Sequence, residues 1–446
     1  MKMSSAMLVR QCLVISLTAW IALVAGAWAG GHIDTENGYA TAEELGLMKG
    51  FPPPPEKRVN RSNALQTPPY VRWSFLNMRT VYPTANINSA DTPVQLPRKA
   101  DKGIQGLMVT NPETGEKVDF DTYLKMTYSD ALVVVEGDTL RHESYLNGMN
   151  ADQPHQMMSV TKSFAGLMNL IAAENGKLKE SDRVVKYIPE LAGTAFDATV
   201  GQVSDMTNSW EFSEDYANPR SGIIKYATVL GFAEPLPDET YEDDIYEFLQ
   251  KQKKDPAHDH GEIFHYQTPK TDVVNWVTNR ATGQSFETDL EERLWKKLGT
   301  EGETYVLLDK DGTLFAGGGL NATPMNLARF AAMMLNDGEF NGQRVISADI
   351  IKTLSEGGNI DAFSNGPESS GVLGNKDWSY RAQWWVRHTP GKEAFTAIGV
   401  HGQWIYIDVD RNIAIIKQSS QPVSSVNYYD EFNINAFDAV IEHLAK

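Results

Sequence analysis

Cysteine is almost absent from this chain, since Cys12 is the one cysteine among 446 residues. It lies in an apolar N-terminal stretch, so a mature chain without that stretch has no disulfide and no cysteine nucleophile. Basic residues are also in short supply: 40 Lys and Arg stand against 58 Asp and Glu, and the net charge is −18. No run of five or more basic residues occurs. Because this charge repels phosphate backbones, we expect no nucleic-acid partner.

The sequence has no internal repeat at a fixed period, which argues against solenoids and propellers. Its contents of 41% hydrophobic, 22% charged and 10% aromatic residues are those of a folded globular protein. The length exceeds the usual size of one domain, so we expect two or three compact units around ample core material.

The first 29 residues have the pattern of a secretory signal peptide. Lys2 and Arg10 precede an apolar stretch over 12–29 that ends in Ala27-Trp28-Ala29, a pattern that signal peptidase accepts. We predict cleavage after Ala29 and a secreted or periplasmic product without stable membrane insertion. An uncleaved membrane anchor is the alternative, because the apolar stretch is long enough to span a bilayer.

Hydrophobic patterning predicts an α/β (α+β) fold, an antiparallel sheet flanked by helices with an inserted all-helical domain. The apolar run 131–135, a turn at 136–138 and a second run to 145 predict a β-hairpin. Further predicted elements lie along the rest of the chain: strands over 304–308, 384–386, 403–408 and 413–418, and helices over 241–254, 271–282, 324–335 and 432–444. The predicted units are a Pro-rich extension over 30–105, a main domain over 106–180 and 296–446, and a helical insert over 181–295.

The segment Ser159-Val160-Thr161-Lys162 places a hydroxyl and an amine one helical turn apart, at the start of a predicted buried helix ending near Gly176. A buried amine can lose its proton near neutral pH and then accept the serine proton. The helix N-terminus favours negative charge, so the Ser159 N–H can help to hold an oxyanion. The alternative is a helix cap followed by a surface lysine, which is how most such pairs occur.

Three segments resemble the serine hydrolases of the class C β-lactamase and penicillin-binding-protein superfamily, and most closely the 6-aminohexanoate-dimer (nylon-oligomer) hydrolases: Met158–Phe164, Phe264–Thr268 and Ile398–Gln403. The resemblance implies a β-lactamase-like fold over roughly 109–446. It also implies that Ser159 is acylated, that Lys162 is the base and that Tyr266 relays protons. The N–H groups of Ser159 and Val400 would form the oxyanion hole. Tyr216, in a loop that resembles one in the nylon-oligomer hydrolases, would contact the amide that is cut.

The chain departs from the superfamily pattern in two places. The third motif has Ala397-Ile398-Gly399 where β-lactamases have Lys-Thr-Gly, so the cation that holds a substrate carboxylate is missing. His401 is the nearest substitute, and Trp385 is a candidate wall of the cleft, although aromatic strand residues such as Trp384 and Trp385 usually belong to the core. The second motif places Thr268 where the family has asparagine. Antibiotic hydrolysis is therefore not expected, whereas small amides and esters are.

No metal or cofactor is expected. His258, His260 and His265 fit no zinc spacing, and we interpret them as solvated loop residues. Gly317-Gly318-Gly319 marks a close backbone approach and not a phosphate loop, since no Gly-Lys-Ser/Thr follows it.

The sequence thus predicts a serine hydrolase for a small amide or ester, of undetermined oligomeric state. The alternatives are a sensor or scaffold that does not turn over substrate, and a carboxylesterase or β-lactamase of the same superfamily.

Overall fold

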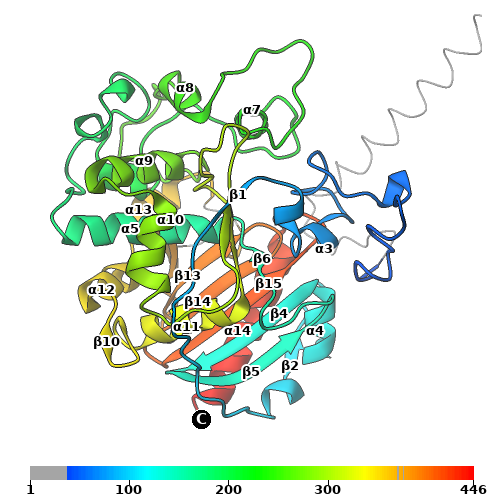
Figure 1. Ribbon diagram of the computed structural model, residues 1–446. Helices are drawn as coiled ribbons and strands as arrows, with labels where there is room; N and C mark the ends of the chain where they lie inside the picture. Colours follow the sequence, from blue (N-terminus) through cyan, green and yellow to red (C-terminus); the bar gives the residue numbers. More distant parts are fainter. Residues whose placement is uncertain (1–37, 369–370, 375) are drawn as a thin grey trace, which may run out of the picture.

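The computed structural model describes residues 38–368, 371–374 and 376–446. Its centre is a seven-stranded antiparallel sheet (Figure 1) with the strand order β11-β12-β13-β14-β15-β4-β5. In chain order these strands are β4 (Ser129–Glu136), β5 (Thr139–Tyr145), β11 (Trp378–Arg381), β12 (Trp384–Arg387), β13 (Ala394–Gly399), β14 (Gln403–Asp408) and β15 (Ile413–Ser419). The predicted mixed fold with an antiparallel sheet is confirmed.

Helices cover both faces of this sheet. Successive side chains of a strand point to opposite faces, and β4 is apolar on both. Val133 and Val135 pack into one core with helices α5 (Val160–Glu174) and α11 (Pro324–Leu335). Leu132 and Val134 pack into another core with α4 (Phe120–Met126) and α14 (Asn427–Leu444). Two-sided burial explains why the strand is a continuous apolar run and does not alternate with polar residues.

A smaller four-stranded sheet carries the chain to the start of α5. Its strand order is β1-β7-β8-β6, formed by β1 (Thr84–Asn86), β7 (Tyr305–Leu307), β8 (Leu320–Ala322) and β6 (His155–Gln156). The sheet joins the N-terminal part of the described chain, through β1, to strands β7 and β8 of the C-terminal half. Two hairpins complete the strands: β2 (Met108–Thr110) with β3 (Lys117–Asp119), and β9 (Glu339–Phe340) with β10 (Gln343–Arg344).

Between residues 181 and 295 the described chain is built of helices and loops, together with a single bridge between Arg183 and Thr199. The helices are α6 (Val200–Ser204), α7 (Gly222–Val229), α8 (Ile245–Gln250), α9 (Lys270–Thr282) and α10 (Phe286–Leu290), the last continued by a π-helical turn at Glu291–Trp295. Helix α9 packs on α5, where the Asn169 Nδ2 donates a buried hydrogen bond to the Thr278 Oγ1 at 2.8 Å. The division into a main domain and an insert stays a prediction.

Residues 38–105 contain helix α3 (Val71–Ser74) and lie against the rest of the chain, because Arg72 of this helix forms a buried ion pair with Asp130 of β4. The remaining helices are α12 (Ala348–Glu356) and α13 (Ile360–Asn365). Short 3-10 turns occur at Pro55–Lys57, Met78–Thr80, Ile104–Gly106, Val184–Lys186 and Pro189–Leu191.

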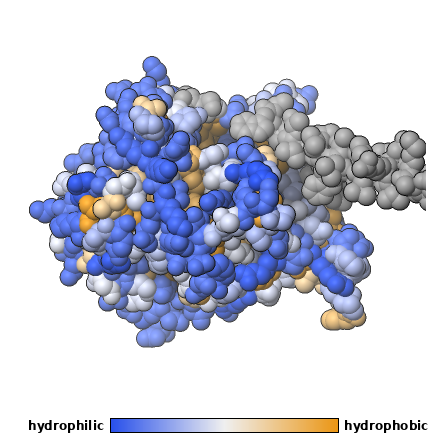
Figure 2. Space-filling view, turned by 90° about the horizontal axis from the view of Figure 1, so that it is seen from above, coloured by the Kyte–Doolittle hydropathy of each residue, from blue (hydrophilic) through white to orange (hydrophobic). Residues whose placement is uncertain are grey.

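Most predicted elements begin and end within a few residues of the observed ones, but the helix expected over 241–254 is shorter. Asp244 caps α8 by accepting a hydrogen bond from the Glu247 N–H, and the helix ends before Lys251. The predicted signal peptide lies outside the described residues. Within those residues, no helix is both long and apolar enough to cross a bilayer. Figure 2 shows a mainly hydrophilic face with hydrophobic residues in small, separate spots.

Candidate active site

Ser159 occupies the N-cap position of α5, directly after the short strand β6. The preceding residue, Met158, has a positive φ of 47°, which is unusual for a residue with a side chain. An N-cap serine normally accepts a hydrogen bond from the helix backbone. The Ser159 hydroxyl makes no such capping bond, and its residue is 8% exposed at the wall of a pocket. The hydroxyl is therefore free to interact with other groups.

Lys162, one helical turn further along α5, provides that interaction. Its Nζ donates hydrogen bonds to the Ser159 Oγ at 2.8 Å and to the Gly317 carbonyl oxygen at 2.5 Å. Burial lowers the pKa of Lys162 to about 8, although the negative charges of Glu214 and Asp272 favour its protonated form. An amine with this pKa is partly neutral at pH 7 to 8, so it can accept a proton from the serine.

Tyr266 lies on the other side of this pair. The Lys162 Nζ is 5.2 Å from the centre of its ring, and the Ser159 side chain is close enough to the phenol to oppose part of the rise in its pKa. Burial raises the pKa of Tyr266 well above its usual value, and the charge of Glu214 adds to the effect. The ring stacks on Trp385 at 5.6 Å, and the Tyr266 N–H donates to Glu368 at 2.8 Å. The phenol is thus held in place and remains protonated at neutral pH.

Glu214 is a member of the cluster that sequence reasoning missed. Its carboxylate accepts hydrogen bonds from the Tyr216 Oη at 2.8 Å, from the Thr268 N–H at 2.6 Å and from the Thr268 hydroxyl. Both predicted neighbours of the reaction centre, Tyr216 and Thr268, are therefore held by one acid. The sequence contains this glutamate two residues before Tyr216, but no local pattern shows that its side chain turns inward.

Asp272 was also not predicted. It lies on α9 and accepts hydrogen bonds from the Tyr226 hydroxyl and from the Ala316 N–H. Burial raises the pKa of Asp272 to about 7. The loop that it holds includes Gly317, whose carbonyl accepts from Lys162. A Cβ on Gly317 would lie 2.8 Å from the side chains of Phe315 and Thr268, which is the close approach expected of this glycine run.

The end of β13 lies against the start of α5. A Cβ on Gly399 would be 2.5 Å from the Met157 carbonyl oxygen and 3.0 Å from the Ser159 nitrogen, so a side chain there would force the two segments apart. Val400, the next residue, lines the pocket together with Ser159. In the described chain, neither the Ser159 N–H nor the Val400 N–H donates to an acceptor. Two unused donors thus lie beside the serine hydroxyl.

His401 does not reach the pocket. Its ring is fully buried, shares a hydrogen bond with the Gln421 carbonyl oxygen at 2.7 Å and packs edge-on against Phe75. Burial lowers the pKa of His401 to about 4, so the ring is neutral and provides no cation for a substrate carboxylate. The two tryptophans of β12 point in opposite directions: Trp384 is buried and donates to the Ser163 carbonyl oxygen at 3.0 Å, whereas Trp385 supports Tyr266.

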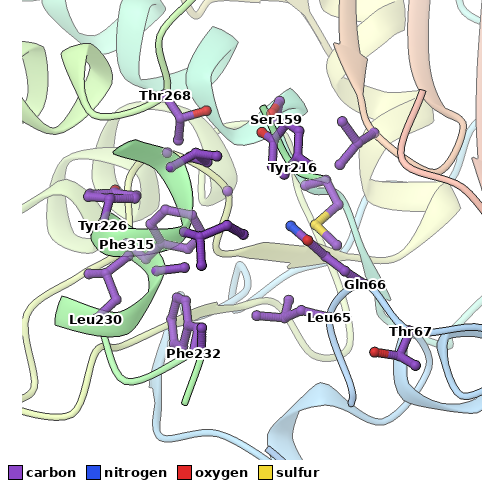
Figure 3. Close-up of a pocket in the computed structure, with 18 of the residues that line it drawn as sticks. Leu65, Gln66, Thr67, Ser159, Tyr216, Tyr226, Leu230, Phe232, Thr268 and Phe315 are labelled. Carbon is purple, nitrogen blue, oxygen red and sulfur yellow. The ribbon is translucent and has the colours of Figure 1, made fainter. Parts of the chain in front are cut away.

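A pocket of about 310 Å³ opens beside this cluster (Figure 3). One end carries Ser159, Lys162, Tyr216 and Thr268, and the polar residues Ser62, Gln66 and Thr67 line another part of it. The rest is lined by residues from three separate parts of the chain: the segment 61–67, the stretch from Ile223 to Glu234 that includes α7, and the 315–318 loop. Trp385 and Tyr266 do not line it.

The histidines near Asp259 are dispersed. The His260 Nδ1 accepts from the Ser209 N–H at 2.9 Å, His265 shares a hydrogen bond with Gln267 at 3.2 Å, and His258 faces Glu262 at 3.7 Å. Across residues 38–368, 371–374 and 376–446, no group of three or more His, Cys, Asp or Glu residues could hold a metal ion.

A serine paired with a buried lysine at the start of a helix, on an antiparallel sheet covered by helices, defines a serine hydrolase of the β-lactamase fold. The beta-lactamase family model matches residues 124–436, and the chain belongs to this family.

The chain is 31% identical over 360 residues to the 6-aminohexanoate-dimer hydrolase of Paenarthrobacter ureafaciens, a match that covers 80% of this chain and 87% of that one. Among solved structures, a Bacillus anthracis protein described as a 6-aminohexanoate-dimer hydrolase superposes with a TM-score of 0.78 at 28% identity, covering 86% of this chain and 97% of the other. A Bacteroides dorei protein described as a β-lactamase shares the fold, with a TM-score of 0.53 at 16% identity over 70% of this chain and 95% of its own.

Proposed function

We propose that this chain is an exported hydrolase that cleaves small amide or ester bonds through an acyl-enzyme intermediate on Ser159. The observation that carries the proposal is the 2.8 Å hydrogen bond between the Lys162 Nζ and the Ser159 Oγ, inside a site where burial lowers the pKa of the lysine to about 8. A hydroxyl becomes an effective nucleophile when a partly neutral amine lies within hydrogen-bond distance of it.

In the first half-reaction the Ser159 Oγ attacks the substrate carbonyl carbon while the neutral Lys162 accepts the hydroxyl proton. The N–H groups of Ser159 and Val400 hold the oxygen that becomes negative. Tyr266 then donates its proton to the leaving nitrogen or oxygen, the bond to the carbonyl carbon breaks, and the protonated Lys162 returns the proton it took from Ser159 to Tyr266. In the second half-reaction, water attacks the carbonyl carbon of the acyl-enzyme while Tyr266 and Lys162 accept its proton. The Ser159 Oγ then leaves, regains a proton, and the acid is released.

The substrate class follows from what lines the pocket and from the relatives. The relative from Paenarthrobacter ureafaciens is named for the hydrolysis of an amide, the 6-aminohexanoate dimer. Among the described residues that line the pocket, the cations are Lys162, which is bonded to Ser159, and Arg61, and the third motif Ala397-Ile398-Gly399 contributes no cation to hold the carboxylate of a β-lactam. These observations favour small amides or esters over antibiotics. The signal pattern over 1–29 supports export to the periplasm or the medium.

The proposal is tested by intact-mass measurement after exposure to an alkyl fluorophosphonate. We expect a rapid gain of one adduct per chain, mapped to Ser159 by peptide sequencing, because this reagent labels serines that a neighbouring base activates. Turnover of a chromogenic ester by the unlabelled protein would then separate an enzyme from a sensor that is acylated once. The absence of an adduct would contradict the proposal and leave a scaffold.

The pH dependence of the activity follows from the protonation state of Lys162. The base acts in its neutral form, and a pKa of about 8 leaves roughly one tenth of it neutral at pH 7. We expect kcat/KM for an uncharged ester to rise nearly tenfold per pH unit below pH 8 and to level off above it. Tyr266 stays protonated over this range because burial raises its pKa. A profile that is flat from pH 6 to 9, with constant circular dichroism, would rule out Lys162 as the base.

A further inference from the structure

The pocket beside Ser159 is apolar over most of its length. Figure 3 shows Ser159 and Thr268 at one end and Leu65 and Phe232 at the other. The lining side chains also include Ile223, Ala227, Leu230 and Phe315, and Leu230 is fully buried. Walls of this kind bind hydrocarbon by removing it from water.

Few of the residues that line the pocket are charged. Of the described residues that line it, Lys162 is buried beside Ser159, whereas Arg61 and Glu234 are exposed. The two exposed charges have opposite signs, so they sum to zero. If a substrate's hydrocarbon chain ended in a charged group inside the apolar part of the pocket, that group would lose its hydration without gaining a partner, which is unfavourable.

The position of Tyr266 indicates which side of the scissile bond the pocket receives. Tyr266 donates a proton to the leaving group in the proposed function, yet it does not line the pocket. The leaving group must approach the phenol, so the part of the substrate that remains on Ser159 lies on the pocket side. The acyl group is therefore the part that contacts the apolar walls.

We infer that this pocket is an acyl-chain site, and that the preferred substrates are amides or esters of an uncharged, medium-length aliphatic acid. The inference rests on the proposed function and adds to it the class of acyl group. The 61–67 segment and α7 contribute residues that determine chain length, including Leu65 and Ala227. The relative's 6-aminohexanoate substrate has a charged end, so this preference distinguishes the two proteins.

The first measurement is kcat/KM of the full-length mature protein for p-nitrophenyl esters of two to twelve carbons. Each methylene that moves from water into an apolar site improves binding roughly fourfold, so we expect the octanoate to exceed the acetate by about tenfold or more. The mono-p-nitrophenyl ester of suberic acid, which adds a terminal carboxylate, should fall about tenfold below the octanoate. Equal rates for the acetate and octanoate, or for the octanoate and the charged ester, would overturn the inference.

Two substitutions then localise the preference. Ala227→Phe places a large side chain in the wall of the pocket and should lower the octanoate-to-acetate ratio by about tenfold, because the chain loses its space. Phe232→Ala enlarges the far end and should move the optimum toward ten or more carbons. Ala257→Phe is the matched control, since Ala257 is exposed and lies outside the pocket lining; its ratio should equal that of the wild type. Unchanged ratios in both pocket variants would show that the chain binds elsewhere.

A further pair of measurements separates failure of this inference from failure of the proposed function. A chain-length preference in alkyl acetates, and not in the acyl esters, would overturn the acyl placement while leaving the hydrolase intact. Calorimetric titration of the Ser159→Ala protein with octanamide and acetamide measures the pocket without any reaction. Tighter binding of octanamide than of acetamide supports the acyl-chain site. If octanamide binds more tightly but the wild type does not turn over esters, only the proposed function is contradicted.

Discussion

Ser159→Ala is expected to lower kcat for a p-nitrophenyl ester by roughly 10⁴-fold or more, because removing the nucleophile of such a unit eliminates the covalent path altogether. The fold should be unchanged. The Ser159 hydroxyl caps no backbone N–H, so its loss removes no capping bond, and alanine is well suited to a helix. Steady-state kinetics on protein with wild-type circular dichroism measures the effect, and the adduct with a fluorophosphonate should disappear at the same time.

Ser163→Ala provides the matched control for this experiment. Ser163 lies on the same helix and is also buried, but its Oγ donates to the Gln383 carbonyl oxygen at 2.7 Å and the residue does not line the pocket. Its substitution should cost stability from a lost hydrogen bond, about 1 kcal/mol, and should leave the fluorophosphonate adduct on Ser159. A Ser159→Ala protein that retains a few per cent of wild-type turnover would show that another group is the nucleophile.

Arg72→Met is expected to reduce the free energy of unfolding by about 3–5 kcal/mol, the usual cost of removing one partner of a buried ion pair. The Arg72 Nη1 donates to the Asp130 Oδ1 at 2.9 Å, and the arginine side chain is 7% exposed. Asp130 also accepts from His155 at 3.0 Å and from the Ser420 hydroxyl at 2.5 Å. Burial alone would raise the pKa of Asp130, but Arg72 and the other partners lower it below its usual value. Without the arginine, a buried carboxylate lacks its cation.

Chemical denaturation followed by tryptophan fluorescence measures this change. Arg98→Met is the control, because Arg98 pairs with Glu143 at the surface, where its side chain is 54% exposed, and such pairs contribute about 0–1 kcal/mol. The pKa of Asp130 is lower in the folded state than in the unfolded state. Its contribution to stability is therefore complete above the pKa of the unfolded state and is lost as the pH falls through the pKa of the folded state. If the free energy of unfolding fell equally in the two arginine variants, the buried Arg72–Asp130 pair would contribute no more to stability than the surface Arg98–Glu143 pair.

Periodicity of apolar residues was sufficient to predict the main secondary structure. The boundaries predicted for β14 and α11 coincide with the observed ones, because a buried strand and a buried helix each leave a long, regular pattern. Strands β11 and β13 were not predicted as strands. The second of these, β13, carries the motif segment Ala397-Ile398-Gly399, whose residues were considered for chemistry and not for pairing.

The site divides in a similar way. The three-residue separation of Ser159 and Lys162 predicts that both side chains project from one face of a helix, and their 2.8 Å contact agrees with it. The inward turn of Glu214 and the contact of Asp272 with the Gly317 loop depend on packing between segments that are distant in sequence. The same holds for His401, whose ring is directed into the core by a backbone with φ of 63°.

What the sequence alone determined is therefore local: the strand and helix patterns, the serine and lysine one turn apart, the single cysteine at position 12 and the lack of a third-motif cation. Only the tertiary structure decided which residues enclose the pocket, because its walls come from the 61–67 segment, from α7 and from the 315–318 loop. The tertiary structure also sets the pKa of Lys162, because burial in the assembled core makes the charged form of the amine unfavourable. Local patterns specify the direction of a side chain on its own helix, whereas long-range packing specifies its surroundings.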